Sequence, residues 1–163
     1  GKDRLFLQII ERIEKSDRQT VLFVDEAHLV SHQALVDLRL LVSAGTDAQL
    51  PLKIVLTGQE ALASQLKRAS LADLVNRINV RFHMKTLTKD QSTAYILSRL
   101  RAAQGNDKLF DSNAISLIHE FAGGVPRQIN NFATACLILA ASRKAAVIDQ
   151  DIVNETMNEF RLP

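Results

Sequence analysis

The stretch Thr20-Val21-Leu22-Phe23-Val24-Asp25-Glu26 decides the fold of this chain. The run Thr20–Val24 contains β-branched residues and shows no alternation of apolar and polar positions. Such a run is typical of a strand buried on both faces of a parallel sheet. Two carboxylates follow it directly, at the edge of the sheet where ligands bind in open α/β folds. The stretch therefore predicts a buried parallel strand that ends in a pair of acidic residues.

The acidic pair suggests phosphate chemistry. The first carboxylate, Asp25, is placed to hold a metal ion among phosphates. The second, Glu26, is placed to orient and polarise a water molecule for attack on a γ-phosphate. A strand that simply ends in a solvated acidic turn fits the same residues, so context has to decide.

Residues 1–88 supply that context. A helix is predicted at 31–43, and residues 47–51 interrupt the regular structure after it. Residues 53–57 are then predicted to form a second short apolar strand. If this strand neighbours the first one, the polar residues Thr57 and Gln59 lie beside Asp25. Further helices are expected at 3–15, 60–67 and 71–77, and a third strand at 79–83. Strands that alternate with helices predict an α/β domain with a parallel sheet.

Residues 89–163 carry helix signals only. They include N-terminal caps, a glycine stop and a proline suited to a first helical turn. These signals are Thr88 with Gln91, Asp111, Gly123 with Gly124, Pro126 and Asp149. The lone cysteine, Cys136, falls in an apolar helical run and is expected to be a buried small hydrophobe. We predict a small all-α bundle.

Composition places the chain among soluble proteins of a reducing compartment. Of its 163 residues, 47% are apolar and 23% are charged. One cysteine cannot form an internal disulfide. No signal peptide is visible, and the longest apolar stretch of about ten residues is shorter than the ~18 needed to span a bilayer. We therefore expect no membrane segment and a cytoplasmic location.

Charge alone does not predict nucleic-acid binding, because the net charge is only +2. The densest basic cluster fits either a DNA-binding patch or a solvated face, and it comprises Lys67, Arg68, Arg77, Arg81, Lys85 and Lys89. His28 and His32 are four residues apart, but no third metal ligand is evident nearby. A serine hydrolase is not indicated, because no nucleophile elbow is present.

Five phrases in order carry a family resemblance. They read DEAH from Asp25, IVLTGQEAL from Ile54, LVNRINVRFHMKTLT from Leu74, GGVPRQINN from Gly123 and VNETMNEFRLP from Val153. From Thr20 to the end, the chain resembles bacterial AAA+ ATPases of the ExeA/GspA-like group. The last two phrases look most like the ATPases encoded beside DDE transposases, which have a TniB/TnsC/MuB-like helper role. Relatives also serve type II secretion and pilus assembly.

The resemblance implies a partial P-loop AAA+ parallel-sheet domain followed by an all-α helical lid, with ATP and Mg²⁺ as cofactors. Asp25 matches the Walker B magnesium carboxylate and Glu26 the catalytic base. Gln59 matches sensor 1, with Thr57 as a weaker candidate. Arg77 matches the arginine finger that reaches a neighbouring subunit, with Arg81 as the alternate, and Arg127 matches sensor 2 of the lid. Surface solvation or a local salt bridge is the alternative for Arg77 and Arg81, and simple solvation at a helix start is the alternative for Arg127.

One element of the family pattern is missing from this sequence. No G-x-x-x-x-G-K-[ST] motif occurs, and Gly1-Lys2 is followed by Asp3 instead of a hydroxyl residue. We expect the chain alone to bind ATP poorly or not at all and to be inactive, and we expect a longer parent protein to be the active ATPase. A first residue other than Met indicates a shortened or processed chain. A missing central strand would expose apolar strand edges in residues 1–88 and favour dimerisation, strand exchange or poor order there.

Three functions remain open. The first is an oligomeric AAA+ ATPase that binds DNA and regulates a transposase. The second is an ATPase of the secretion or pilus machinery, with a secretion-apparatus protein as partner. The third is a degenerate AAA+ scaffold that binds partners without catalysis.

Overall fold

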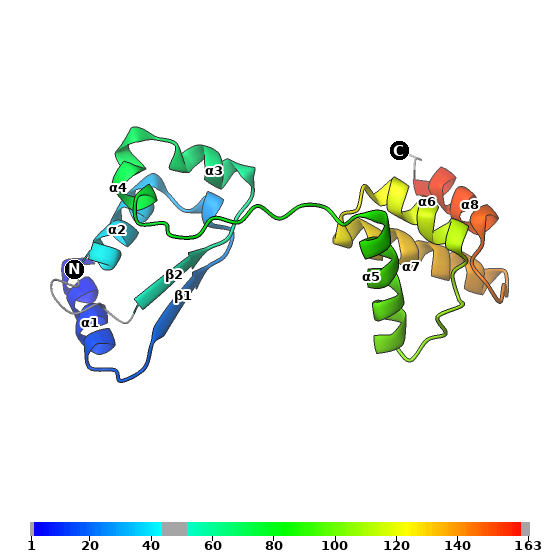
Figure 1. Ribbon diagram of the computed structural model, residues 1–163, viewed down its shortest axis with the longest axis horizontal. Helices are drawn as coiled ribbons and strands as arrows, with labels where there is room; N and C mark the ends of the chain where they lie inside the picture. Colours follow the sequence, from blue (N-terminus) through cyan, green and yellow to red (C-terminus); the bar gives the residue numbers. More distant parts are fainter. Residues whose placement is uncertain (1, 44–51, 161–163) are drawn as a thin grey trace. The chain divides into compact units, whose positions relative to one another are not determined.

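The computed structural model describes residues 2–43 and 52–160. It divides the chain into two compact units, Gly1–Phe82 and His83–Pro163 (Figure 1). The boundary expected from the sequence, at residue 88, lies six residues beyond this division. No helix among the described residues is long and apolar enough to cross a membrane.

The first unit is built on a parallel pair of strands. β1 (Thr20–Val24) pairs with β2 (Leu52–Leu56), with Thr20 opposite Leu52 and Val24 opposite Leu56 (Figure 1). Parallel strands need a crossover connection, and it contains helix α2 (His32–Ser43). The predicted α/β class is confirmed. The second strand begins one residue earlier than expected, and the predicted break at 47–51 lies outside the described residues.

Helices pack on this pair of strands through a small leucine cluster. Buried Leu35 of α2 meets buried Leu71 and Leu74, and Leu56 of β2 packs against them. These residues join α2 and β2 to two short elements, η2 (Ala69–Leu71) and α4 (Ala72–Val75). The other helical elements of the unit are α1 (Lys2–Glu14), η1 (Ala27–Leu29) and α3 (Glu60–Leu66).

The prediction that Thr20–Val24 is buried on both faces is wrong for the described chain. Phe23 is 70% exposed, and Val21 and Leu22 are exposed as well. Burial on both faces of a strand requires a wider sheet with layers above and below it. The sheet formed by the described residues has only two strands, so the centre of β1 is left uncovered.

The predicted third strand at 79–83 is also wrong. The segment carries no strand pairing, and Val80 and Phe82 are 82% and 86% exposed. Alternation of side chains describes a segment that suits a sheet, but a strand exists only when a neighbour accepts and donates its hydrogen bonds. No such neighbour is found among the described residues.

The second unit is the predicted helical bundle. It comprises α5 (Lys89–Ala102), α6 (Ser112–Ala122), α7 (Pro126–Ser142) and α8 (Gln150–Phe160). The capping box is confirmed, because the Gln91 N–H donates to Thr88 Oγ1 at 3.3 Å and the Thr88 N–H donates to Gln91 Oε1 at 2.9 Å. Asp111 Oδ1 accepts from the Ala114 N–H at 2.6 Å, and Asp149 Oδ1 accepts from the Ile152 N–H at 3.1 Å.

The interior of the bundle is mainly aliphatic, and it also holds buried Phe110 and a cluster of three phenylalanines. Phe132 is buried and stacks on Phe121 with ring centroids 4.1 Å apart, and Phe160 meets both rings edge-on. Cys136 is fully buried as predicted. Burial raises the pKa of its thiol, which keeps it in the unreactive protonated form.

A close backbone contact fixes the entry to α7. Gly123 and Gly124 end α6 with φ values of 56° and 71°. The Leu87 N–H donates to the Gly124 carbonyl at 2.8 Å. A Cβ atom on Gly124 would lie 2.2 Å from the Leu87 carbonyl oxygen, whereas one on Gly123 would meet nothing within 4 Å. Of these two glycines, only Gly124 therefore combines a left-handed backbone with a closed space.

These two glycines provide a matched pair of substitutions. Gly123→Ala should lower the free energy of unfolding of the bundle by roughly 1–2 kcal/mol, the cost of a left-handed alanine. Gly124→Ala should lower it by roughly 2–5 kcal/mol, because the added methyl group also forces the Leu87 backbone aside. Chemical denaturation followed by the amide signals of α5–α8 measures both. Equal losses for the two variants would contradict this account.

Candidate functional site

The ends of β1 and β2 assemble an acidic cluster. Because Val24 pairs with Leu56, the next residues, Asp25 and Thr57, lie side by side. The ladder continues past the strands: the Thr57 N–H donates to the Val24 carbonyl at 3.0 Å, and the Ala27 N–H donates to the Thr57 carbonyl at 2.8 Å. The backbone thus fixes the spacing of the two side chains.

Asp25 is held as an oriented carboxylate. Its Oδ1 accepts from the Thr57 hydroxyl at 2.6 Å and from the Glu26 N–H at 2.8 Å. The hydrogen bond from Thr57 is the main reason that the pKa of Asp25 is lowered, and the Glu26 N–H and the nearby His28 act in the same direction. Among the described residues Oδ2 has no hydrogen-bond partner, so this oxygen is available to a cation.

Glu26 sits in a strained turn next to His28. Its backbone is left-handed, with φ 50° and ψ 36°, a conformation that costs a non-glycine residue about 1–2 kcal/mol. Glu26 Oε2 lies 3.4 Å from His28 Nδ1, and the Gln59 N–H points to the same nitrogen at 3.4 Å. A ring nitrogen either accepts a hydrogen bond or carries a proton. His28 Nδ1 therefore accepts a hydrogen bond from the Gln59 N–H in the tautomer without a hydrogen on this nitrogen. In the form that carries a hydrogen there, the same nitrogen is placed to donate to Glu26 Oε2.

The structure brings four of the sequence-predicted residues into this cluster: Asp25, Glu26, Thr57 and Gln59. The Thr57 side chain contacts Asp25 directly, whereas Gln59 approaches through its backbone N–H at the start of α3. His28, whose spacing from His32 indicated at most a metal ligand, contacts both Glu26 and the Gln59 N–H through Nδ1. No group of three His, Cys, Asp or Glu residues suited to a metal ion occurs within the described parts of the chain.

The three candidate arginines, Arg77, Arg81 and Arg127, are not part of the acidic cluster. Arg81 donates to the Val75 carbonyl at 3.3 Å, and the side chain of Arg77 makes no hydrogen bond or ion pair with any described residue. Arg127 is the second residue of α7, in the other unit, so its relation to the acidic cluster remains an expectation from the sequence. The basic cluster is likewise divided, with Lys85 and Lys89 in the second unit.

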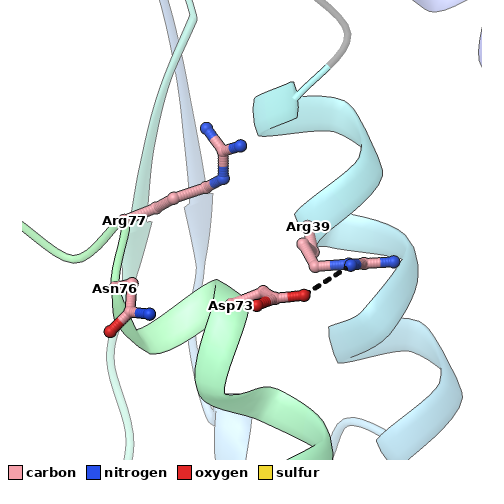
Figure 2. Close-up of a pocket in the computed structure, with 4 residues that line it drawn as sticks. All are labelled: Arg39, Asp73, Asn76 and Arg77. Atoms are coloured by element: carbon pink, nitrogen blue, oxygen red, sulfur yellow. Dashed lines mark hydrogen bonds and ion pairs between the residues drawn. The ribbon is translucent and has the colours of Figure 1, made fainter.

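Arg77 lines a cavity that the sequence did not predict. The cavity has a volume of about 250 Å³ and is lined by Arg39, Asp73, Asn76 and Arg77 (Figure 2). Arg39 Nη1 of α2 donates to Asp73 Oδ2 of α4 at 2.8 Å. Figure 2 shows the Arg77 side chain extending toward α2 across the same space. Partners 34 residues apart leave no local signal, so this grouping could not be read from the sequence.

The hydrogen bond between Thr57 and Asp25 can be tested directly. Thr57→Val removes the hydroxyl and should raise the pKa of Asp25 toward its ordinary value, because the largest stabilisation of the carboxylate is lost. Thr57→Ser keeps the donor and should leave the pKa low. An NMR pH titration of the Asp25 carboxyl carbon in metal-free protein measures both, and an unchanged titration in the valine variant would contradict the geometry.

Comparisons with known proteins support an AAA+ ATPase relationship. Residues 1–66 match the family model described as AAA domain. The chain is 35% identical over 126 residues to General secretion pathway protein A of Aeromonas hydrophila, a match that covers 77% of this chain and 23% of that protein. The chain thus spans about a quarter of this relative's length.

Solved structures agree at the level of the fold. The RuvB Holliday junction branch migration motor of Thermotoga maritima matches with a TM-score of 0.72 and 19% identity, over 97% of this chain and 50% of that one. Two point mutants of the same motor give TM-scores of 0.70 at 21% identity and 0.69 at 19% identity, each again over 97% of this chain and 50% of that one. The short parallel sheet with its helices therefore has an AAA+ fold.

Proposed function

We propose that this chain supplies the water-activating and intersubunit parts of an AAA+ ATP hydrolase. The observation that carries the proposal is the carboxylate of Asp25, held ionised by Thr57 at the carboxyl end of a parallel strand, with Glu26 as the next residue. The carboxylate of Asp25 is held in one orientation, and that of Glu26 lies nearby beside His28. Such a pair suits metal-assisted hydrolysis of a phosphate.

The donor set of the cluster fits Mg²⁺ bound to a nucleotide. Mg²⁺ is usually held by one or two carboxylates together with substrate phosphates and water. Asp25 would hold it through Oδ2, since Oδ1 is occupied by the Thr57 hydroxyl and the Glu26 N–H. When bound there, such an ion would supply positive charge to offset the charge that develops on the phosphates. The present sequence contains no P-loop motif, so the phosphate cradle is not among the residues described.

Glu26 would accept the proton of the attacking water. Its side chain is 58% exposed and therefore reachable by water. His28 Nδ1 lies 3.4 Å from Glu26 Oε2, so the imidazole would help to position the Glu26 carboxylate. Gln59, whose backbone N–H competes for the same nitrogen, would orient the water molecule from the sensor 1 position.

Arg77 is the better candidate for the arginine finger. Arg81 is engaged with the Val75 carbonyl, while the guanidinium of Arg77 reaches into an open cavity (Figure 2). A finger needs a free guanidinium that a neighbouring subunit's nucleotide can meet. Such a role requires self-association, and Arg127 would complete it by contacting the γ-phosphate as sensor 2.

The hydrolase proposal is tested in a polypeptide in which a P-loop segment precedes this chain. Glu26→Gln should lower the rate of ATP hydrolysis at least about 10²-fold, as expected when a general base is lost, while ATP binding is retained. Arg77→Ala should lower it about 10³-fold, and Arg81→Ala is the matched control with a small effect. Full activity of the Glu26→Gln enzyme would refute the proposal.

Two physiological roles follow from different observations. The 35% identity to a general secretion pathway protein favours an ATPase of the secretion machinery. The phrases from Gly123 and from Val153 favour a helper that binds DNA and regulates a transposase. A scaffold without catalysis is the remaining alternative, and it predicts no hydrolysis in any longer polypeptide.

A DNA-binding assay separates the first two roles. The transposition role requires ATP-dependent binding to duplex DNA that weakens steeply as salt is raised, because phosphate contacts release counterions. The secretion role predicts no ATP-dependent binding to DNA. The measurement is fluorescence anisotropy with the ATP-bound longer polypeptide at several salt concentrations, with the Arg127→Ala variant for comparison.

A further inference from the structure

Asp73 has two arginines that can pair with it. Arg39 Nη1 of α2 donates to Asp73 Oδ2 of α4 at 2.8 Å, although the two residues are 34 positions apart. Arg77 stands four positions after Asp73 and lines the same cavity as the ion pair. On a helix, a carboxylate and an arginine four positions later are neighbours that can form an ion pair. Asp73 therefore has a distant partner in Arg39 and an alternative, local one in Arg77.

The backbone after α4 keeps the local pairing possible. The Asn76 N–H donates to the Ala72 carbonyl at 2.9 Å, and the Arg77 N–H donates to the Leu74 carbonyl at 3.1 Å. The chain thus continues to turn with helical hydrogen bonds as far as Arg77. The order is also the favourable one, because an acid that precedes a base by four positions pairs better than the reverse.

The structure shows the distant pairing. In Figure 2 the Asp73 carboxylate meets Arg39, whereas the Arg77 guanidinium points away from Asp73. The side chain of Arg77 makes no hydrogen bond or ion pair with residues 2–43 or 52–160. The Arg39 side chain is only 34% exposed, and a partly buried ion pair is screened less than one in open solvent. Arg39 is therefore the stronger competitor for the carboxylate.

We propose that Arg39 is a positioning residue for Arg77. By engaging Asp73, Arg39 prevents an ion pair between Asp73 and Arg77 and so leaves the Arg77 guanidinium available. The effect of this on hydrolysis rests on the proposed function, in which Arg77 is the arginine finger. The proposal has a distinctive consequence: the loss of Arg39 affects Arg77 through Asp73, so the additional loss of Asp73 restores Arg77.

The test measures hydrogen exchange between the Arg77 Nε–H and water by NMR in the 163-residue chain. A guanidinium that is hydrogen-bonded to a carboxylate exchanges more slowly than one exposed to water. Arg39→Gln should slow the exchange about two- to fivefold, the range expected for an exposed ion pair. The double variant Arg39→Gln/Asp73→Asn should exchange like the unmodified chain, and so should Asp73→Asn alone.

Two variants serve as controls. Arg39→Lys keeps a positive charge opposite Asp73, since lysine can replace Nη1 as a point charge, and it should leave the exchange of Arg77 unchanged. Arg101→Gln removes the exposed ion pair with Asp107 in the second unit, and it should have no effect either. The methyl signals of the leucine cluster report in every variant whether α2 still packs on α4.

Two results would overturn the proposal. One is unchanged exchange in Arg39→Gln. The other is slow exchange that persists in the double variant, because a packing defect caused by the loss of Arg39 does not need Asp73. The exchange measurement involves no nucleotide, so its result is independent of whether the hydrolase proposal holds.

A second measurement links the ion pair to hydrolysis. In the polypeptide with a preceding P-loop segment, Arg39→Gln should lower the rate of ATP hydrolysis about two- to fivefold, and the double variant should restore the rate. If the exchange of Arg77 follows the variants and hydrolysis does not, the positioning role of Arg39 stands and the role of Arg77 as the arginine finger is refuted.

Discussion

Asp25 and Thr57 meet because β1 and β2 run in parallel with Val24 opposite Leu56. Antiparallel strands would send the residues that follow them to opposite edges of the sheet. A slip of one residue would turn every side chain of one strand to the other face. The 2.6 Å hydrogen bond, the ionised carboxylate and the contact of Ala27 with Thr57 all depend on this register. The acidic cluster is thus a product of strand pairing.

The cavity lined by Arg39, Asp73, Asn76 and Arg77 is a product of helix packing. Leu35, Leu71 and Leu74 bring α2 against α4, and the ion pair between Arg39 and Asp73 spans the two elements at the surface. Strands therefore place the carboxylates, and helices place the guanidinium groups. The first unit thus carries both kinds of group on separately supported elements.

Much of the fold could be predicted from the sequence, and the predictions that were wrong failed for the same physical reason. Helix ends are encoded locally, so Thr88 with Gln91 marked the start of α5 correctly. The parallel order of strands followed from the strand and helix pattern. The strand at 79–83 and the double burial of β1 failed because both depend on neighbours that the described chain does not supply. In the site, Asp25 and Glu26 could be predicted because they directly follow a strand. The contact of His28 with Gln59 and the pairing of Arg39 with Asp73 could not, because each joins residues more than 30 positions apart in the sequence.

The stretch around Phe82 has a consequence for how this chain behaves in concentrated solution. Val80, Phe82 and Met84 are each more than 80% exposed and alternate with Arg81, His83 and Lys85. Exposed apolar residues at every second position are a template for cross-β aggregation. If identical copies stacked in register, however, Arg81 would face Arg81 and Lys85 would face Lys85, and like charges opposite one another destabilise strand pairing. The interleaved cations act as gatekeepers: they oppose fibre growth from copies of this chain, while leaving the stretch able to pair with a strand that carries the opposite charge.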